Sequence, residues 1–232
     1  FALIMAFLAR GYKMLVYKAV QQEFKVDVLR KEIEHTQKEI VFTLAETCEM
    51  RSKETGNHVK RVAEYSRLLA LKCGLSDTEA EIVRLASPMH DIGKIAIPDS
   101  ILLKHGPLAP VEMEIMKTHA NLGFDLLRKS DRRILKASAI IAHEHHERWN
   151  GEGYPRKLCA EGIHIYGRIA ALADVFDALG HDRCYKKAWD LERIIDYLAE
   201  EKGGIFDPSI VTVFMANIDE FLKINEMYRE AV

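Results

Sequence analysis

The sequence lacks the marks of several protein classes. Its four cysteines are scattered and form no C-x-x-C pair, so we expect free thiols and a reducing compartment. No apolar run reaches the roughly 18 residues of a transmembrane helix. The apolar start, residues 1–9, spans only nine residues and opens on Phe rather than Met. No charged segment precedes it, as a secretory signal requires. We interpret it as packing surface at the end of a truncated upstream region.

An excess of one charge is also missing. The net charge is −2, which gives no general reason to expect a nucleic-acid polymer or an anionic membrane as partner. Of the 232 residues, 48% are hydrophobic, enough for a sizeable core in one large domain or in a domain with an appendage. We expect a cytoplasmic location, with a membrane-anchored full-length protein as the alternative.

Alternating Val, Ile and Thr runs, the pattern of strands, are absent as well. Apolar residues recur instead at three- and four-residue spacing, which is typical of helices, so the sequence predicts an all-α fold. Ser76 and Glu79 have the spacing of a capping box that opens a helix. Other helices are expected near residues 53–72, 110–128, 132–148, 168–180, 190–201 and 208–228, with an irregular loop over residues 150–166.

Residues 14–50 contain no proline or glycine. Leu29, Ile33, Ile40 and Leu44 recur there at near-heptad intervals, which favours a long connecting helix that pairs with a second copy of the chain. An ordinary amphipathic helix on the domain surface explains the same pattern equally well. We divide the chain into an N-terminal linker helix, residues 1–40, and a main domain, residues 41–232.

Three histidines crowd the stretch HEHHERWNGEGYP, residues 143–155. On a helix with 100° per residue, His145 and His146 continue the apolar lines of residues 132–148, whereas His143 falls on the opposite side with Lys136. The pattern therefore predicts that His145 and His146 point to the core and that His143 points to water. A buried histidine needs a partner for each ring nitrogen, or a metal. Hydrogen-bonded core histidines are the alternative to metal ligands.

Other ligand-type residues stand at the heads of apolar helix faces. Glu54 lies one turn before His58, so one metal ion could bind both, although a solvated helix start is compatible too. His119 leads an apolar stripe, which also happens where a stripe meets solvent. Asp174 lies among alanines, where a carboxylate needs a partner; the alternative partner is an arginine.

A His-Asp pair, His90 and Asp91, adds a further imidazole and carboxylate, and Lys94 follows one turn later. Nitrogen and carboxylate ligands together suit iron, manganese, zinc or nickel better than calcium. No cysteine stands among the candidates, which argues against a structural zinc site.

These motifs resemble the HD-GYP family, a branch of the HD superfamily of metal-dependent phosphohydrolases. HDIGK stands at residues 90–94 and HHERWNGEGYP at 145–155; around them lie ETGNH at 54–58, KTHANLG at 117–123, ADVFDAL at 173–179 and FDP at 206–208. Their order and spacing match the family over residues 36–221. The resemblance implies an HD-superfamily helical bundle behind a long N-terminal connecting helix.

The resemblance also implies a centre of two or three divalent metal ions, with iron or manganese expected. Asp91 would bridge two of the ions. The presence of Glu54 favours three, because the family's three-metal members resemble this sequence there. Carried over by motif position, the ligands are Glu54, His58, His90, Asp91, His119, His145, His146 and Asp174.

The activity that the family implies is hydrolysis of cyclic di-GMP to pGpG and, in some members, on to GMP. A metal-bridging water would be the nucleophile, and Asp91 and Lys94 would be the catalytic residues. Lys94, one turn from His90, is a candidate to bind the phosphate or to help the leaving oxygen. Arg183 and Lys186 match the family's phosphate-binding basic pair, with solvated surface charges as the alternative. Two alternatives stay open within the resemblance: 3′,3′-cyclic GMP-AMP as the substrate, and a signalling module that binds a dinucleotide or a partner without cleaving it. A hydrolase of another nucleotide, such as a linear one, is a third option.

Departures from the family pattern lie near the substrate rather than among the ligands. Asn150 stands where many members have Asp, and Gly180, His181 and Cys184 replace the commoner Thr-Ser…Pro pattern after the DAL sequence. These departures leave open which nucleobases the site prefers. The GYP loop, which contains Gly153, Tyr154 and Pro155, is associated in the family with contacts to diguanylate cyclases. A long helix entering a catalytic domain is similar to sensor and response-regulator proteins, so we expect an upstream sensory or receiver domain.

Overall fold

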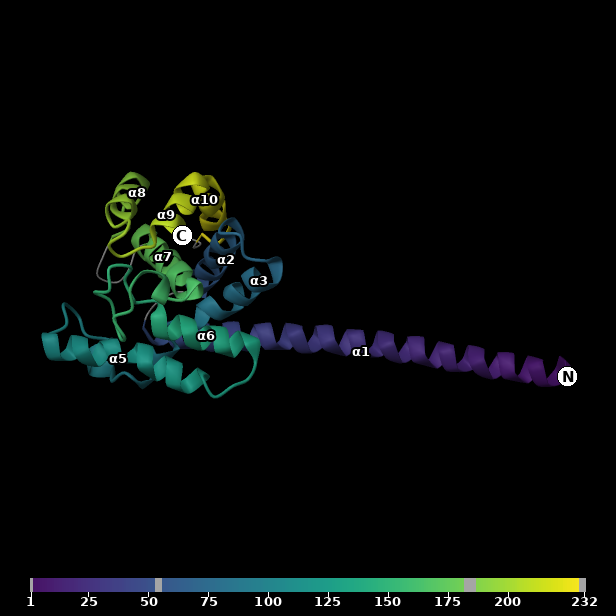
Figure 1. The fold of residues 1–232 in the computed structure, drawn as a ribbon. Helices are drawn as coiled ribbons and strands as arrows, with labels where there is room; N and C mark the ends of the chain where they lie inside the picture. Colours follow the sequence, from purple (N-terminus) through teal and green to yellow (C-terminus); the bar gives the residue numbers. More distant parts are fainter. Residues whose placement is uncertain (1, 53–55, 182–186, 230–232) are drawn as a thin grey trace. The chain divides into compact units, whose positions relative to one another are not determined.

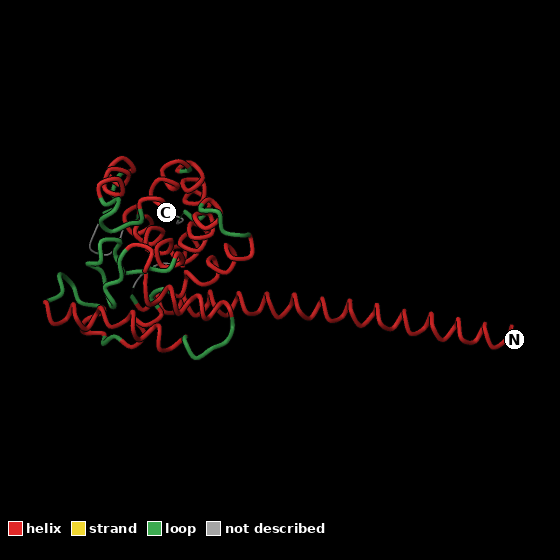
Figure 2. Tube along the Cα trace, viewed as in Figure 1, coloured by secondary structure: helices red, strands yellow, loops and turns green. Residues whose placement is uncertain are grey.

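The computed structural model describes residues 2–52, 56–181 and 187–229. Over these residues the chain is helical and forms no strand (Figure 2), which confirms the predicted all-α fold. Contacts along the chain divide it into two units, Phe1–Ile40 and Val41–Val232.

The first unit is formed by a single helix. Helix α1 runs from Ala2 to Arg51, and its turns from Val41 onward belong to the second unit. The predicted long helix is thus present and begins well before residue 14. Its large apolar side chains between Leu3 and Ile40 are exposed. In the described parts of the chain, no helix combines the length and apolar character that crossing a membrane requires.

The second unit contains the remaining helices, coloured in chain order in Figure 1. They are α2 (Gly56–Lys72), α3 (Asp77–Ala86), the 3₁₀ turns η1 (Ser87–Met89) and η2 (Ile92–Ala96), α4 (Asp99–Leu102), α5 (Pro110–Leu127), α6 (Arg133–Glu144), the 3₁₀ turn η3 (Ala160–Gly162), α7 (Ile165–Gly180), α8 (Leu191–Glu200), α9 (Pro208–Ala216) and α10 (Ile218–Met227). The capping box predicted for Ser76 and Glu79 opens α3.

Two predicted helices have different bounds in the structure. Helix α6 ends at Glu144 rather than near residue 148. The helix expected over residues 208–228 is broken at Asn217, which separates α9 from α10. The side-chain Nδ2 of Asn217 donates a hydrogen bond to the carbonyl of Val213 at 2.7 Å. A side chain that bonds the nearby backbone in this way favours a helix end.

Of the three apolar clusters in the second unit, the two with the most buried residues position the site. In the larger one, edge-to-face and tilted contacts join the rings of Tyr65, Phe176, Phe214 and Phe221 from α2, α7, α9 and α10. The smaller one joins the end of α1 to α2, η1, η2, α5 and α6. Because α2 contributes to both clusters, its first turn is held firmly, and His58 lies in that turn.

A glycine lets η2 and α5 touch. A Cβ atom on Gly93 would lie 1.9 Å from the carbonyl oxygen of His119 and 2.6 Å from the amide nitrogen of Gly123. No side chain fits there, so the backbones pack directly on each other. This contact brings Asp91, which precedes η2, next to His119 on α5.

Candidate metal centre

Asp91 stands at the centre of the candidate site. It lies between η1 and η2, and 7% of its surface is exposed. Its Oδ1 lies 3.1 Å from His119 Nε2 and 3.6 Å from His145 Nε2. Its Oδ2 lies 3.3 Å from His90 Nε2 and also contacts the Lys94 ammonium. The two oxygens of one carboxylate therefore face two different groups of side chains.

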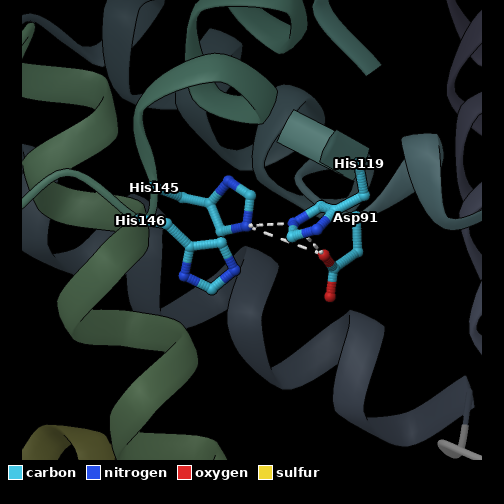
Figure 3. Close-up of side chains that lie close together, drawn as sticks. All are labelled: Asp91, His119, His145 and His146. Carbon is cyan, nitrogen blue, oxygen red and sulfur yellow. Dashed lines mark hydrogen bonds and ion pairs between the residues drawn. The ribbon is translucent and has the colours of Figure 1, made fainter. Parts of the chain in front are cut away.

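The first group consists of Asp91, His119, His145 and His146. One ligand atom from each lies within 4.8 Å of all the others. In Figure 3 the imidazoles of His119 and His145 point toward each other and toward the carboxylate, with 3.4 Å between their Nε2 atoms. The side chains come from the η1–η2 junction, from α5 and from the end of α6, so the tertiary fold assembles this pocket.

The second group consists of Glu49, His58 and His90. Their ligand atoms also lie within 4.8 Å of one another, and all three residues are buried. Asp174 on α7 approaches this pocket, with its Oδ1 at 3.7 Å from the Nε2 atoms of both His58 and His90. The two pockets are thus adjacent, and Asp91 lies between them.

Four of these histidines are held through the same ring nitrogen. Nδ1 of each lies within hydrogen-bond distance of a fixed acceptor: Asp177 Oδ2 for His58 (2.8 Å), and the carbonyls of Ser87 for His90 (2.9 Å), Met116 for His119 (2.7 Å) and Ile141 for His145 (3.0 Å). Because these oxygens only accept, Nδ1 carries the hydrogen, and Nε2 of the neutral ring presents a lone pair.

That tautomer fits metal binding. The facing Nε2 atoms of His119 and His145 would otherwise be two lone pairs 3.4 Å apart beside a carboxylate, an arrangement that needs a cation or a proton between the groups. Donation from the remote ring nitrogen to a carbonyl or carboxylate is also how metal-binding histidines are usually oriented. The side chains present therefore fit divalent ions in both pockets.

Charge differs between the pockets. Burial lowers the pKa of both His145 and His146, which keeps these imidazoles neutral and able to bind a metal. Burial also lowers the pKa of His90, but the charges of Asp91 and Asp174 outweigh it and raise the pKa to about 10. The second pocket, rich in carboxylates, thus attracts positive charge, which a divalent ion would supply in place of the proton.

A buried ion pair supports His58 from behind. Asp177 Oδ1 accepts from Arg61 Nε at 2.6 Å, and Oδ2 accepts from Arg61 Nη2 at 3.0 Å. Both side chains are 1% exposed. Burial raises the pKa of Asp177, but its hydrogen bonds with His58 and Arg61 outweigh this and hold the pKa at about 2. Asp177 thus remains ionised and fixes the His58 ring.

Carboxylates at the end of α6 hold the GYP loop. Glu147 accepts the backbone N–H groups of Arg156 at 2.7 Å and Leu158 at 3.0 Å, and Glu144 pairs with the Arg156 guanidinium. A Cβ atom on Gly153 would lie 2.3 Å from the amide nitrogen of Arg148. The loop is therefore packed tightly against the residues that follow α6.

This loop places Tyr154 against the first pocket. The Tyr154 ring stacks on His146, with centroids 4.7 Å apart and planes 29° apart, and Lys117 Nζ lies 5.6 Å from the Tyr154 centroid. Beside them is a cavity of about 680 Å³ between α5 and the loop. Its lining includes three cationic side chains, Lys117, Arg148 and Lys157, together with Tyr154.

The structure brings most of the predicted site residues together. Seven predicted ligands surround the two pockets: His58, His90, Asp91, His119, His145, His146 and Asp174. Lys94, predicted to act in catalysis and phosphate binding, contacts Asp91. Glu54, Arg183 and Lys186 lie outside the described residues.

The prediction for His143 was wrong. It is 8% exposed rather than turned to water, because α5 covers that side of α6. Its Nε2 lies 3.0 Å from Asn121 Oδ1, and its ring stacks on Phe124 at 4.2 Å. His143 belongs to neither pocket. His146, expected to be buried, is intermediate in exposure.

Sequence reasoning also missed residues around the centre. Glu49 lies near the end of α1, five residues before the carboxylate that was predicted instead. Arg61 and Asp177 were available as signals, because Arg61 lies on α2 one turn after His58 and Asp177 lies on α7 one turn after Asp174. A charged residue one turn away from each of two predicted ligands thus indicates an ion pair that supports those ligands.

Comparison with known proteins identifies the family. The family model described as "HD domain" matches residues 43–210. The chain belongs to the HD domain family. The resemblance to its HD-GYP branch, predicted from the motifs, is confirmed by curated relatives.

Two of these relatives show the similarity. The 3′3′-cGAMP-specific phosphodiesterase 2 of Vibrio cholerae is 47% identical over 84% of this chain and 38% of its own length. The cyclic di-GMP phosphodiesterase response regulator RpfG of Xanthomonas campestris is 41% identical over 85% of this chain and 52% of its own. This HD domain therefore spans about half or less of the relatives that it matches.

A solved structure confirms the fold alone. The crystal structure of a cyclic GMP-AMP specific phosphodiesterase of V. cholerae, V-cGAP3, has a TM-score of 0.61 and 20% identity, and covers 80% of this chain and 50% of that one.

Proposed function

We propose that this HD domain is a metal-dependent phosphodiesterase that hydrolyses cyclic di-GMP to pGpG, with GMP as a further product. The observation that carries the proposal is the Asp91 carboxylate, whose two oxygens face two adjacent histidine pockets. Two divalent ions bridged by a carboxylate form a common centre for phosphoryl chemistry. Relatives 41% and 47% identical are named as phosphodiesterases of cyclic dinucleotides.

We propose that Asp91, His119, His145 and His146 hold one ion, and that His58, His90, Asp91 and Asp174 hold a second. Glu54 would serve a third. Iron or manganese suits this set of nitrogen and carboxylate donors. When bound, such ions lower the pKa of a coordinated water toward neutrality and neutralise charge on the phosphate oxygens.

Lys94 acts in this proposal as a fixed positive charge. Burial lowers the pKa of its ammonium, but the charges of Asp91 and Glu49 outweigh that effect and raise the pKa above its ordinary value. In the metal-free protein Lys94 is therefore held as an ammonium. Its place beside Asp91 suits it to bind the scissile phosphate and to stabilise charge on the leaving oxygen.

The remaining substrate contacts are proposed from the cavity beside the first pocket and from the family's phosphate-binding positions. Tyr154 and Arg148 line the cavity next to the first pocket, so an aromatic ring and a cation are available to a nucleobase and a second phosphate. Lys117 lines it too, and its ammonium pairs with Glu114 at 2.6 Å. We also propose Arg183 and Lys186 as phosphate contacts, because the family resemblance assigns them to phosphate binding. Both lie outside the described residues.

The test is turnover of cyclic di-GMP and of 3′,3′-cyclic GMP-AMP by the same metal-loaded preparation, with metal content verified and products separated by chromatography. We expect hydrolysis of cyclic di-GMP, and loss of that activity in Asp91→Ala and His90→Ala. No turnover of either dinucleotide by fully loaded protein would refute the enzyme proposal and leave a binding module.

Preference for 3′,3′-cyclic GMP-AMP is the second candidate. A relative 47% identical is named as specific for that dinucleotide, whereas the relative named for cyclic di-GMP is 41% identical. The two substrates differ only in one base. A higher kcat/KM for the mixed dinucleotide in the same assay would decide for this candidate.

We further propose that residues 1–40 link a sensory or receiver domain to the cytoplasmic catalytic unit and pair with a second copy. Leu29, Ile33 and Ile40 are about half exposed there, which leaves apolar surface for a partner helix. Sedimentation with and without residues 1–40 tests the pairing.

The GYP loop is proposed to contact a diguanylate cyclase. A pull-down with purified cyclase tests this contact.

A further inference from the structure

Glu49 is a buried carboxylate with one unsatisfied oxygen in the described protein. It lies near the end of α1, within the second unit, and is 1% exposed. Its Oε2 accepts a hydrogen bond from Ser52 Oγ at 3.1 Å. Among the residues that the structure describes, its Oε1 makes no hydrogen bond.

Lys94 and His90 interact with Glu49 through charge, but in the described structure neither donates a hydrogen bond to its Oε1. The cation nearest along the chain does not pair with it either. Arg51, two residues later, donates to the carbonyl oxygens of Lys94, Ile95 and Ile97 at 2.6–2.8 Å, and to Asp99 at 2.8 Å. Its guanidinium is therefore committed to η2 and the start of α4. An unpaired ionised carboxylate is costly to bury, and such groups are paired or bind a metal.

Two imidazole nitrogens complete a donor set around Glu49. Ligand atoms of Glu49, His58 and His90 all lie within 4.8 Å of one another. Nδ1 of both rings is already held, by Asp177 and by the carbonyl of Ser87. The buried Nε2 of His90 makes no hydrogen bond in the described structure. One carboxylate oxygen and two imidazoles therefore converge on one small volume, as the ligands of a metal ion do.

We propose that Glu49 is a metal ligand in the pocket of His58 and His90. The proposal rests on the metal centre of the proposed function. It adds a carboxylate from α1 to the ligands expected from the motifs, and it does not depend on Glu54. An oxygen and two nitrogens suit iron, manganese or zinc.

Glu49→Gln tests this assignment because it keeps the size of the side chain and removes its charge. Stripped protein is titrated with Mn²⁺ alone, and bound metal is counted by elemental analysis after dialysis. We expect the affinity of one site to fall at least about 10- to 100-fold, the range for losing even a supporting residue of a metal site. The matched control is Glu46→Gln, three residues earlier on α1, whose carboxylate pairs with Lys60 at 3.7 Å and is 32% exposed; it should bind Mn²⁺ as the unaltered chain does.

Two further measurements separate ligation from other roles. Glu49→His offers a nitrogen donor and should recover Mn²⁺ binding, with X-ray absorption showing one oxygen neighbour replaced by nitrogen. Anomalous scattering from a crystal of the unaltered, Mn²⁺-loaded chain should place an ion at bonding distance from Glu49, and this needs no variant to fold. Unchanged Mn²⁺ affinity in folded Glu49→Gln, or an ion bound only by other residues, would overturn the proposal.

These readouts are independent of catalysis because no substrate is present. If the loaded chain hydrolyses neither dinucleotide but Glu49→Gln still loses an ion, the proposed function fails and the ligand assignment holds. Full turnover together with full metal content in Glu49→Gln would instead support the proposed function and overturn the ligand assignment. Titrating Glu54→Gln in parallel shows whether the two carboxylates serve the same ion.

Discussion

Replacing Asp177 by asparagine should affect both the stability of the fold and metal binding. The carboxylate accepts two hydrogen bonds from Arg61, at 2.6 and 3.0 Å, and lies 2.8 Å from His58 Nδ1. Asparagine has the same shape but only one acceptor oxygen and no charge. Arg61, 1% exposed, would lose its counterion and keep a bond to the carbonyl of Tyr228 at 3.1 Å.

The magnitude follows from burial. Removing one partner of a buried ion pair leaves an uncompensated charge and costs about 3–5 kcal/mol. The second effect falls on His58, whose ring loses the acceptor that orients it, so metal affinity should drop about 10- to 100-fold. The pKa of Asp177 is lowered from 3.8 to about 2. The ionised carboxylate therefore stabilises the folded state of the unaltered chain above pH 3.8, and this stabilisation is lost as the pH falls toward 2. The variant lacks it at every pH.

Urea unfolding of the metal-free protein measures the first effect, and Mn²⁺ titration measures the second. The double variant Arg61→Met, Asp177→Leu is the control because it removes both charges. We expect it to recover most of the stability while its metal affinity stays low, since His58 still lacks an acceptor. A loss of less than about 1 kcal/mol in Asp177→Asn, with unchanged metal affinity, would show that the Arg61–Asp177 pair supports neither the fold nor His58.

Three other substitutions test separate parts of the structure. Gly153→Ala puts a Cβ atom 2.3 Å from a backbone nitrogen, so we expect a shifted GYP loop and lower activity with metal content retained; normal kcat and KM would contradict this tight packing. His143→Ala should cost about 1–3 kcal/mol in urea unfolding, through its lost stacking and hydrogen bond, and leave metal content unchanged; loss of an ion would make His143 a ligand. Burial raises the pKa of Asp207, but hydrogen bonds from Ser209 and Arg168 outweigh it and hold the pKa below 3.8. The unaltered chain should therefore lose stability as the pH falls below 3.8. Asp207→Asn should be about 1–3 kcal/mol less stable at neutral pH because Arg168 loses its charged acceptor, and parallel pH profiles of the two chains would contradict this.

Local periodicity was sufficient to predict the helices and the inward side chains of most candidate residues. The apolar stripes of α2 and α7 are the buried faces of the larger cluster, and the predicted ligands His58 and Asp174 lie on those two helices. The helix breaks were harder to predict. Asn217 interrupts a continuous apolar pattern through a bond from its own side chain, and α6 ends where Glu147 turns to hold the GYP loop.

What the sequence could not supply were contacts between distant segments. A helical wheel of α6 cannot show that Phe124 and Asn121 on α5 cover His143. Glu49 lies on a helix with exposed side chains over most of its length, and its burial depends on packing around η1 and η2. The pair of Arg61 and Asp177 joins residues 116 positions apart.

The most direct test of the central claim is reconstitution of stripped protein with increasing Mn²⁺ or Fe²⁺, counting bound ions and measuring hydrolysis of cyclic di-GMP and 3′,3′-cyclic GMP-AMP on the same samples. We expect no turnover without metal, and activity that rises only as both pockets fill around Asp91. Hydrolysis at full rate by protein verified to be metal-free, or no hydrolysis of either dinucleotide by fully loaded protein, would contradict this expectation.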